Sequence, residues 1–212
     1  MSAYPVFLEL AGERVLVVGA GPVAARKVAG LLRAGASVTV VAPDAVPDIA
    51  EDPDVRWHAR EYRRGEAASY RLVLTATDDP AVNRQVARDG RAANVFVNSA
   101  DDPANCSFTL PAVVERGDLR IAIGTGGRSP AFARWVRERL EQQFSDVHAR
   151  LLDVLGDVRD EVRAEFGTSE LPGGPSVIDD DLVAAVAAGR DDEARDRVRA
   201  ALGLSNSPRG VA

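Results

Sequence analysis

Residues 14–29 constrain the fold of this chain more than any other stretch. A β-branched apolar run over 15–18 stops at Gly19, Ala20 and Gly21, and a helix-forming segment starts at once. A strand, a tight glycine turn and a helix in this order bring backbone N–H groups and a helix N-terminus to one point, which suits a pyrophosphate. The stretch therefore predicts a dinucleotide-binding unit, while a doubly wound domain with a merely structural glycine turn is the alternative.

The first half of the chain continues the alternation of strand and helix. Strands are expected over 14–19, 38–42, 55–59, 72–76 and 95–98, with helices over 22–34, closed by Gly35, and from Asp79 or Pro80 to about 93. Strands that alternate with helices form a parallel sheet with helices on both faces. We therefore predict an α/β fold in which residues 1–113 form a Rossmann-type domain.

The pattern changes in the second half. The expected elements are strands over 107–110 and 119–123, a helix over about 130–165, a Gly- and Pro-rich linker over 166–175, and helices over 178–189 and 191–202. The acidic run Asp179–Asp181 suits the start of a helix, where negative charge is favoured. We expect a small α+β segment over 114–150 and a C-terminal helical domain over 151–212.

Charge and cysteine content exclude several classes of function. The chain has 212 residues and a formal net charge of −6, which argues against nucleic-acid binding. Cys106 is its only cysteine, which excludes an internal disulfide and a cysteine-cluster metal site, and we predict no metal site. Neither His58 nor His148 is assigned a role. No signal-peptide pattern and no apolar run of about 20 residues is present, so we expect a cytoplasmic protein without membrane contact.

The glycine turn predicts the cofactor contacts. Its pattern is Gly19-x-Gly21-x-x-Ala24, in which alanine at the third position still allows close helix–strand packing. Asp44, just beyond the second strand, is either the acid that holds the adenosine ribose or an ordinary loop carboxylate. No arginine stands at this strand end, which favours NAD over NADP. The predicted cofactor-binding residues are Gly19, Gly21, Pro22, Val23, Pro43, Asp44 and Thr77.

Four motifs in order are more specific than the glycine turn alone. They are YPVFL at 4–8, the segment Gly21–Lys27 with its Arg26-Lys27 pair, NSADDPANCSF at 98–108, and IGTGGRSP at 123–130. Over about residues 4–150 the chain resembles the sirohaem-biosynthesis dehydrogenases, a family of precorrin-2 dehydrogenases. The resemblance implies NAD-dependent oxidation of precorrin-2 to sirohydrochlorin and, in some members, insertion of Fe²⁺ to give sirohaem. It also implies a homodimer whose subunits contact each other through a dimerisation region at about residues 114–150.

The resemblance also suggests site residues. Asp101 aligns with the aspartate that the family implicates in both activities, and a carboxylate at the sheet edge is a suitable base; the alternative is plain turn chemistry in Asp-Asp-Pro. A cationic helix N-terminus suits the carboxylates of a tetrapyrrole, and the alternative is a capped helix with an exposed arginine. Thr125 stands where many members have serine. The predicted substrate-binding residues are Thr125, Gly126, Gly127, Arg128 and Ser129.

Two other functions are compatible with parts of the sequence. A regulatory NAD-binding sensor without catalysis would need residues 14–44, but neither Asp101 nor the segment 124–130. A dehydrogenase for another small substrate would share the cofactor site. Binding and turnover of a tetrapyrrole separate both from the leading hypothesis.

Overall fold

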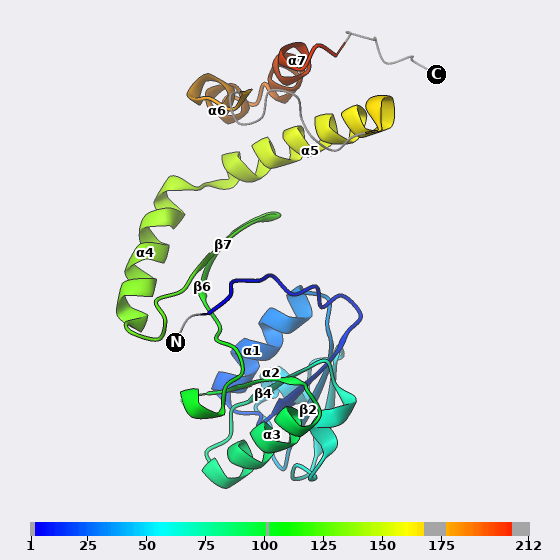
Figure 1. Ribbon diagram of the computed structural model, residues 1–212, viewed down its shortest axis with the longest axis vertical. Coiled ribbons are helices and arrows are strands. Elements are labelled where there is room, and N and C mark those ends of the chain that lie inside the picture. The colour runs from blue at the N-terminus through cyan, green and yellow to red at the C-terminus, as the bar shows by residue number, and fades with distance from the viewer. Residues whose placement is uncertain (1–2, 101, 168–176, 205–212) are drawn as a thin grey trace. The chain divides into compact units, whose positions relative to one another are not determined.

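The computed structural model describes residues 3–100, 102–167 and 177–204 (Figure 1). The chain divides into two compact units, with the boundary between Leu110 and Pro111.

The first unit is built on a five-stranded parallel sheet of order β3-β2-β1-β4-β5. Its strands are β1 Arg14–Val18, β2 Ser37–Ala42, β3 Val55–Ala59, β4 Leu72–Thr75 and β5 Phe96–Ser99. Its helices are α1 Pro22–Arg33, α2 Pro47–Ala50 and α3 Pro80–Ala92, with 3₁₀ turns η1 Glu66–Ser69 and η2 Pro103–Asn105. The predicted Rossmann-type α/β fold is confirmed.

The burial of the central strand β1 on both faces explains why its sequence is apolar throughout and does not alternate. Val15 and Val17 belong to the core formed with α1 and α2. Leu16 and Val18 belong to a second core, formed with α3 on the other face. A parallel strand covered by helices on both faces needs apolar side chains at every position.

The described residues of the second unit form an antiparallel hairpin and four α-helices. They are β6 Ala112–Arg116, β7 Leu119–Ile123, α4 Pro130–Gln143, α5 Asp146–Phe166, α6 Asp180–Ala187 and α7 Asp191–Ala201. Helices α5, α6 and α7 enclose a core of their own, to which Val158, Leu182 and Val198 contribute fully buried side chains. The Asp179 side chain caps α6 by accepting from Leu182 N at 2.9 Å, which confirms that the acidic run starts a helix.

Two predicted elements were wrong. Residues 107–110 are not a strand of the hairpin, which β6 supplies instead. The main-chain N–H of Ser107 donates to Val97 O at 2.8 Å, and its Oγ accepts from Val97 N at 2.7 Å, so this irregular segment covers the open edge of β5. The expected helix over 130–165 is two helices, because Phe144 is extended and Ser145 begins a new N-terminus, where His148 Nδ1 accepts from Ser145 N at 3.1 Å.

Candidate functional site

The carboxyl ends of four strands meet at one edge of the sheet. Val18 lies opposite both Val41 and Thr75, and Thr75 lies opposite Ser99, so β1, β2, β4 and β5 end at the same level. From β1 the chain adds β2 and β3 on one side of the sheet, and later adds β4 and β5 on the other side. The space beyond β1 and β4 is therefore the switch point, at which parallel α/β sheets bind their ligands.

Gly19 allows the ends of β1 and β4 to lie close together. It has a φ of +101°, and a Cβ added there would lie 2.4 Å from the carbonyl oxygen of Ala76. Ala76 is held in place because its N–H donates to Val18 O at 2.8 Å. Any side chain at Gly19 would therefore collide with the backbone of the neighbouring strand end.

Gly21 has a different environment. Its φ is −83°, and a Cβ added there meets nothing within 4 Å, so open space borders the start of α1. Pro22 has no N–H, and the N–H of Ala25 is the first to donate within the helix, to Gly21 O at 3.0 Å. The N–H groups of Val23 and Ala24 thus have no acceptor in a preceding turn and, with the helix dipole, suit a phosphate.

These features fit the pyrophosphate of a dinucleotide. The two glycines give a tight turn and an open approach, and the helix start supplies N–H donors. Ala24 is fully buried against the sheet, where a larger side chain would push α1 away. A nicotinamide dinucleotide therefore has a suitable pyrophosphate site beside Gly21.

The other predicted cofactor residues surround the same edge. Pro43 and Asp44 are exposed directly after β2, and the Asp44 carboxylate makes no hydrogen bond or ion pair with the residues described. The Thr77 methyl lies 3.1 Å from the Cβ position at Gly19. Its hydroxyl donates to Asn83 Oδ1 at 2.9 Å and accepts from Asp79 N at 3.2 Å. The Thr77 hydroxyl therefore holds the turn that leads into α3.

Asp101 lies outside the described residues, but both of its neighbours are held at this edge. The N–H of Ala100 donates to Thr75 O at 2.9 Å, which extends the pairing of β5 with β4. Asp102 accepts from Asn105 Nδ2 at 2.6 Å, and the Cys106 thiol donates to Ser99 O at 3.2 Å. Cys106 thus ties the segment after Asp101 back to β5.

The sequence did not predict a contact between the chain's single lysine and β5. Lys27 Nζ on α1 donates to Asn98 Oδ1 at 3.3 Å, and Asn98 Nδ2 donates to Phe108 O at 3.1 Å. Asn98 is only 8% exposed. These two hydrogen bonds link α1, β5 and the irregular segment 107–110 beside β5. The available signals were a lone lysine near the glycine turn and an amide inside an apolar strand.

The segment 124–129 forms a compact turn before α4. Gly126 and Gly127 have φ values of +60° and +77°, and Arg128 N donates to Thr125 O at 3.2 Å, as in a type I′ turn. The hydroxyl of Thr125 hydrogen-bonds the backbone of Ser129, and Ser129 Oγ accepts from Phe132 N at 3.1 Å. Ser129 is therefore the N-cap of α4, and both hydroxyls hold the helix start. Arg128 is exposed and pairs with no acid among the residues described.

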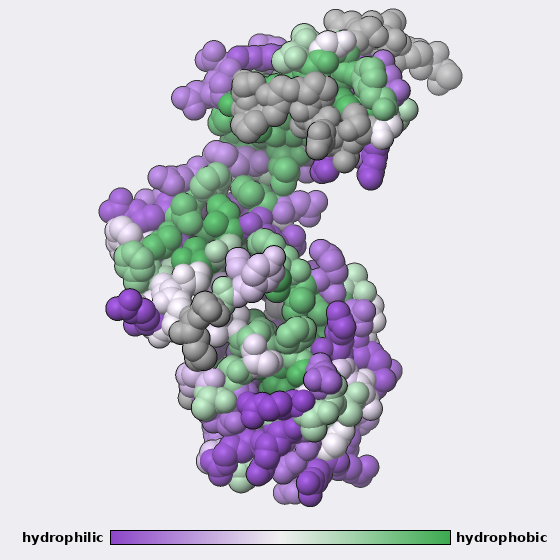
Figure 2. Space-filling view, viewed as in Figure 1, coloured by the Kyte–Doolittle hydropathy of each residue, from purple (hydrophilic) through white to green (hydrophobic). Residues whose placement is uncertain are grey.

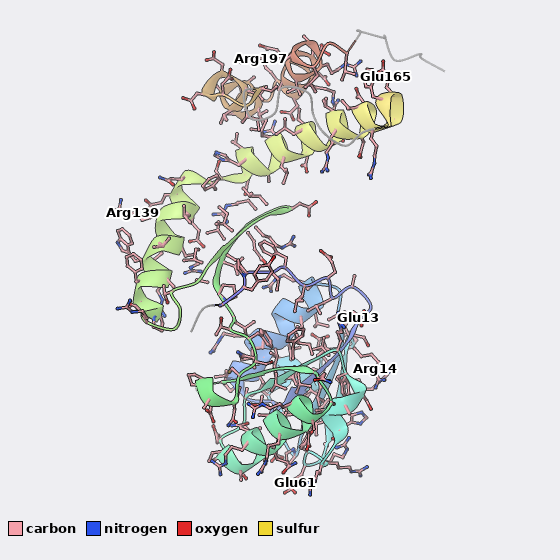
Figure 3. The ribbon with its side chains drawn as sticks, in the orientation of Figure 1. Glu13, Arg14, Glu61, Arg139, Glu165 and Arg197 are labelled. Carbon is pink, nitrogen blue, oxygen red and sulfur yellow. The ribbon has the colours of Figure 1, made fainter. Side chains whose placement is uncertain are left out.

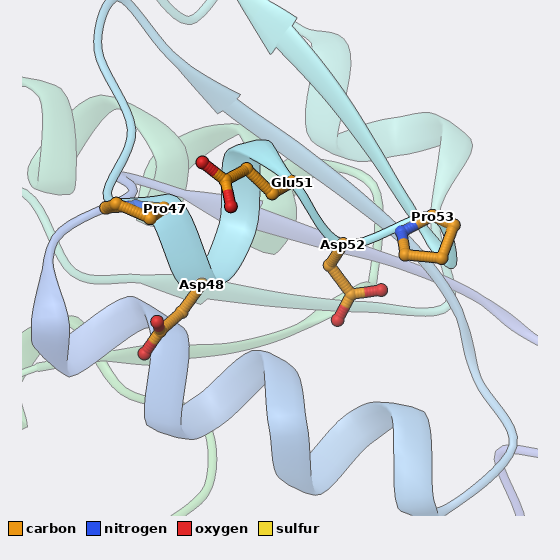
Figure 4. Close-up of a pocket in the computed structure, with 5 residues that line it drawn as sticks. All are labelled: Pro47, Asp48, Glu51, Asp52 and Pro53. Atoms are coloured by element: carbon orange, nitrogen blue, oxygen red, sulfur yellow. The ribbon is translucent and has the colours of Figure 1, made fainter.

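A shallow depression beside α2 is not a candidate for the cofactor site. Pro47, Asp48, Glu51, Asp52 and Pro53 line it (Figure 4). Its three carboxylates repel phosphate groups. Within the described parts of the chain, no cluster of three or more His, Cys, Asp or Glu side chains could hold a metal ion. No helix among the described residues is long and apolar enough to cross a membrane.

Comparison with family models agrees with the division of the chain. Residues 6–112 match the model of a family described as NAD(P)-binding, which covers the whole parallel sheet. Residues 116–143 match the central region of sirohaem biosynthesis proteins, which spans the end of the hairpin and α4.

Individual proteins show the same similarity. The chain is 38% identical to siroheme synthase of Methylobacillus flagellatus over 173 residues, 80% of this chain and 37% of that protein. It is 33% identical to siroheme synthase of Pseudoalteromonas atlantica over 215 residues, 99% of this chain and 46% of that protein. The chain thus spans less than half the length of these relatives. Its structure resembles that of SirC, a precorrin-2 dehydrogenase, with a TM-score of 0.74, 26% identity, and coverage of 93% of this chain and 100% of SirC.

Proposed function

Because this chain belongs to the NAD(P)-binding family whose model matches residues 6–112, we propose that it is a dehydrogenase that uses NAD to oxidise precorrin-2 to sirohydrochlorin. The observation that carries the proposal is the likeness to SirC, which extends over all of that protein and therefore includes both units of this chain. The open approach beside Gly21 supports it independently, because that geometry suits a dinucleotide.

The residues around β1 and β2 would hold the cofactor. The N–H groups of Val23 and Ala24 donate to the pyrophosphate, and Asp44 accepts from the hydroxyls of the adenosine ribose. A carboxylate at Asp44 also repels the 2′-phosphate of NADP, which supports NAD as the cofactor. When bound, the nicotinamide ring supplies the hydride acceptor of the reaction.

The oxidation also releases a proton. Asp101 directly follows Ala100, whose N–H is bonded to Thr75 O at the carboxyl edge of the sheet. We assign Asp101 as the base that takes this proton, since aspartate is among the side chains that act as general bases in enzymes. The hydride and the proton together account for the two hydrogens that precorrin-2 loses.

The second unit would bind the carboxylates of the substrate and a second subunit. The turn from Thr125 to Ser129 presents Arg128 at the start of α4, where a cation and a helix N-terminus both attract carboxylates. In residues 111–144, all of which the structure describes, only Val114 and Ala133 are buried. Figure 2 shows apolar side chains gathered around α4 and the hairpin. A homodimer would cover the apolar surface of this hairpin.

The test is turnover by the purified protein. Incubation with NAD and precorrin-2 should yield sirohydrochlorin and NADH in equal amounts, and NADP should support a lower rate. Absence of turnover in a folded preparation that binds NAD would overturn the proposal. Binding of NAD without binding of any tetrapyrrole would instead indicate a sensor. The same preparation is assayed for Fe²⁺ insertion against the non-enzymatic rate, since the family resemblance implies this second activity in some members.

A further inference from the structure

Strand β5 carries an amide side chain on the face of the sheet that α1 covers. Asn98 lies opposite Leu74 of β4, and Leu74 belongs to the core formed with α1 and α2. Asn98 is only 8% exposed. An amide in such a place is costly unless both its oxygen and its nitrogen are hydrogen-bonded. Both are bonded here, so the partners of this amide indicate what it does.

The nitrogen of this amide closes a loop. Asn98 Nδ2 donates to Phe108 O at 3.1 Å, across the nine residues between them. The chain is tied a second time just inside this contact, because Ser99 N donates to Cys106 Sγ at 3.2 Å and the thiol donates to Ser99 O at 3.2 Å. We call residues 99–107 the β5 loop. Its two ends lie side by side, as in an Ω-loop.

Lys27 determines which way the Asn98 amide faces. The Lys27 ammonium donates to Asn98 Oδ1 at 3.3 Å. An ammonium has donors but no acceptor, so it can pair with the amide oxygen but not with the amide nitrogen. The oxygen therefore faces Lys27, which turns Nδ2 toward Phe108 O. Without the ammonium, rotation of the amide would bring its oxygen against the Phe108 carbonyl, where two acceptors repel each other.

This lysine belongs to the helix that begins at the pyrophosphate site. Helix α1 packs on β1 and β2, and β4 lies between β1 and β5 in the sheet. The Lys27 side chain therefore reaches from α1 past β4 to β5. Because α3 contacts β5 from the other face, Lys27 provides a link between α1 and the strand from which the β5 loop starts.

We propose that Lys27 is a positioning residue, which orients the Asn98 amide and thereby keeps the β5 loop closed with Asp101 at the edge of the sheet. Its role in catalysis rests on the proposed function, in which Asp101 is the base and the start of α1 binds NAD. The pair of Lys27 and Asn98 then sets the spacing between cofactor and base. Misplacement of a reacting group by about 1 Å can cost about a hundredfold in rate.

The test uses Cys106 as a probe of the β5 loop, because it is the only thiol in the chain. Its reaction with a neutral pyridyl disulfide is followed by absorbance. Lys27→Met keeps the length of the side chain and removes the donor. Arg33→Met is the matched control, because Arg33 is exposed in the last turn of α1, at the opposite edge of the sheet, where Arg14 begins β1 (Figure 3).

The expected result separates the rate of catalysis from cofactor binding. Lys27→Met should react at Cys106 about tenfold faster, because the loop loses the effect of a charged hydrogen bond. Its kcat for precorrin-2 should fall about tenfold or more, whereas the dissociation constant of NAD should change less than about twofold. The control should match the wild type in all three measurements. Parallel losses of NAD affinity and kcat would mean that Lys27 merely supports α1, and would overturn the proposal.

Other outcomes distinguish this proposal from the proposed function. An unchanged Cys106 rate in Lys27→Met overturns it, whether or not the wild type oxidises precorrin-2. Faster modification at an unchanged kcat also overturns it, because the loop would then have no consequence for catalysis. A wild type without turnover overturns the proposed function and with it the catalytic role of Lys27, and the Cys106 rates then test its hold on the loop alone.

A second variant decides the matter if Lys27→Met unfolds at much lower urea than the wild type. Asn98→Asp keeps an acceptor for Lys27 but has no donor for Phe108 O. It should therefore show the same faster reaction of Cys106 and the same lower kcat. Wild-type values of both in Asn98→Asp would overturn the proposal, because the amide nitrogen would then not hold the β5 loop.

Discussion

Replacing Gly21 by alanine should separate cofactor binding from folding. Gly21 has a φ of −83°, which alanine adopts freely, and the added Cβ meets no atom within 4 Å. Alanine is a poorer N-cap than glycine but restricts the unfolded chain, so the free energy of unfolding should change by less than about 1 kcal/mol. The new methyl group, however, occupies the approach of the pyrophosphate. Affinity for NAD should fall at least about tenfold, or about 1.4 kcal/mol.

Gly19→Ala is the matched control, because its main effect should be on folding. Its φ of +101° strains any residue other than glycine, and its Cβ would lie 2.4 Å from the Ala76 oxygen and 2.7 Å from the Ala76 carbonyl carbon. Positive φ costs about 1–3 kcal/mol, and the displacement of packed backbone adds about 1–3 kcal/mol. We therefore expect Gly19→Ala to lower the free energy of unfolding by about 2–6 kcal/mol.

Both variants are compared by urea unfolding without ligand and by calorimetric titration with NAD. The expected pattern is a stable Gly21→Ala protein with weakened NAD binding, and a destabilised Gly19→Ala protein. If Gly21→Ala binds NAD as tightly as the wild type does, the pyrophosphate does not approach Gly21. If it is as unstable as Gly19→Ala, the space beside Gly21 is not open.

Three further substitutions test the catalytic assignment, an ion pair of the first unit and the core of the second unit. Asp101→Ala should abolish oxidation of precorrin-2 while NAD binding is retained, and continued turnover would remove Asp101 from the mechanism. The hydrogen bond from Arg60 lowers the pKa of Glu66, so this pair stabilises the fold above the unfolded-state pKa of glutamate and ceases to do so as pH falls through the lowered value. Glu66→Gln should therefore cost about 1 kcal/mol at neutral pH and much less in acid, as measured by urea unfolding; an equal cost at both pH values would contradict this. Leu182→Ala should destabilise the helices of the second unit by about 2–5 kcal/mol, because Leu182 is fully buried, and a loss below about 1 kcal/mol would contradict the packing of this core.

Local sequence patterns predicted correctly those helices and strands that are specified mainly by their own residues. The run over 15–18 forms a strand, as predicted, and is buried on both faces. The segment 107–110 alternates as a strand should, yet it bonds to the edge of β5 through Ser107. The helical periodicity also continues across Phe144 and Ser145, where the chain in fact starts a new helix. Periodicity thus describes which faces are apolar, but edge pairing and capping decide where an element lies and ends.

The candidate site was predictable to the extent that its chemistry is carried by backbone. A glycine turn between a strand and a helix is typical of a nucleotide site, so the sequence alone already predicts a cofactor site at this turn. The contact between Lys27 and Asn98 joins residues 71 positions apart and depends on how α1 lies over the sheet, which no local pattern specifies. Even within the turn, the motif treats Gly19 and Gly21 alike. The structure gives them different reasons to be glycine, because one side chain would meet Ala76 and the other would meet only open space. Folding therefore accounts for the first glycine, whereas the second glycine suits both its N-cap position and the proposed approach of a pyrophosphate.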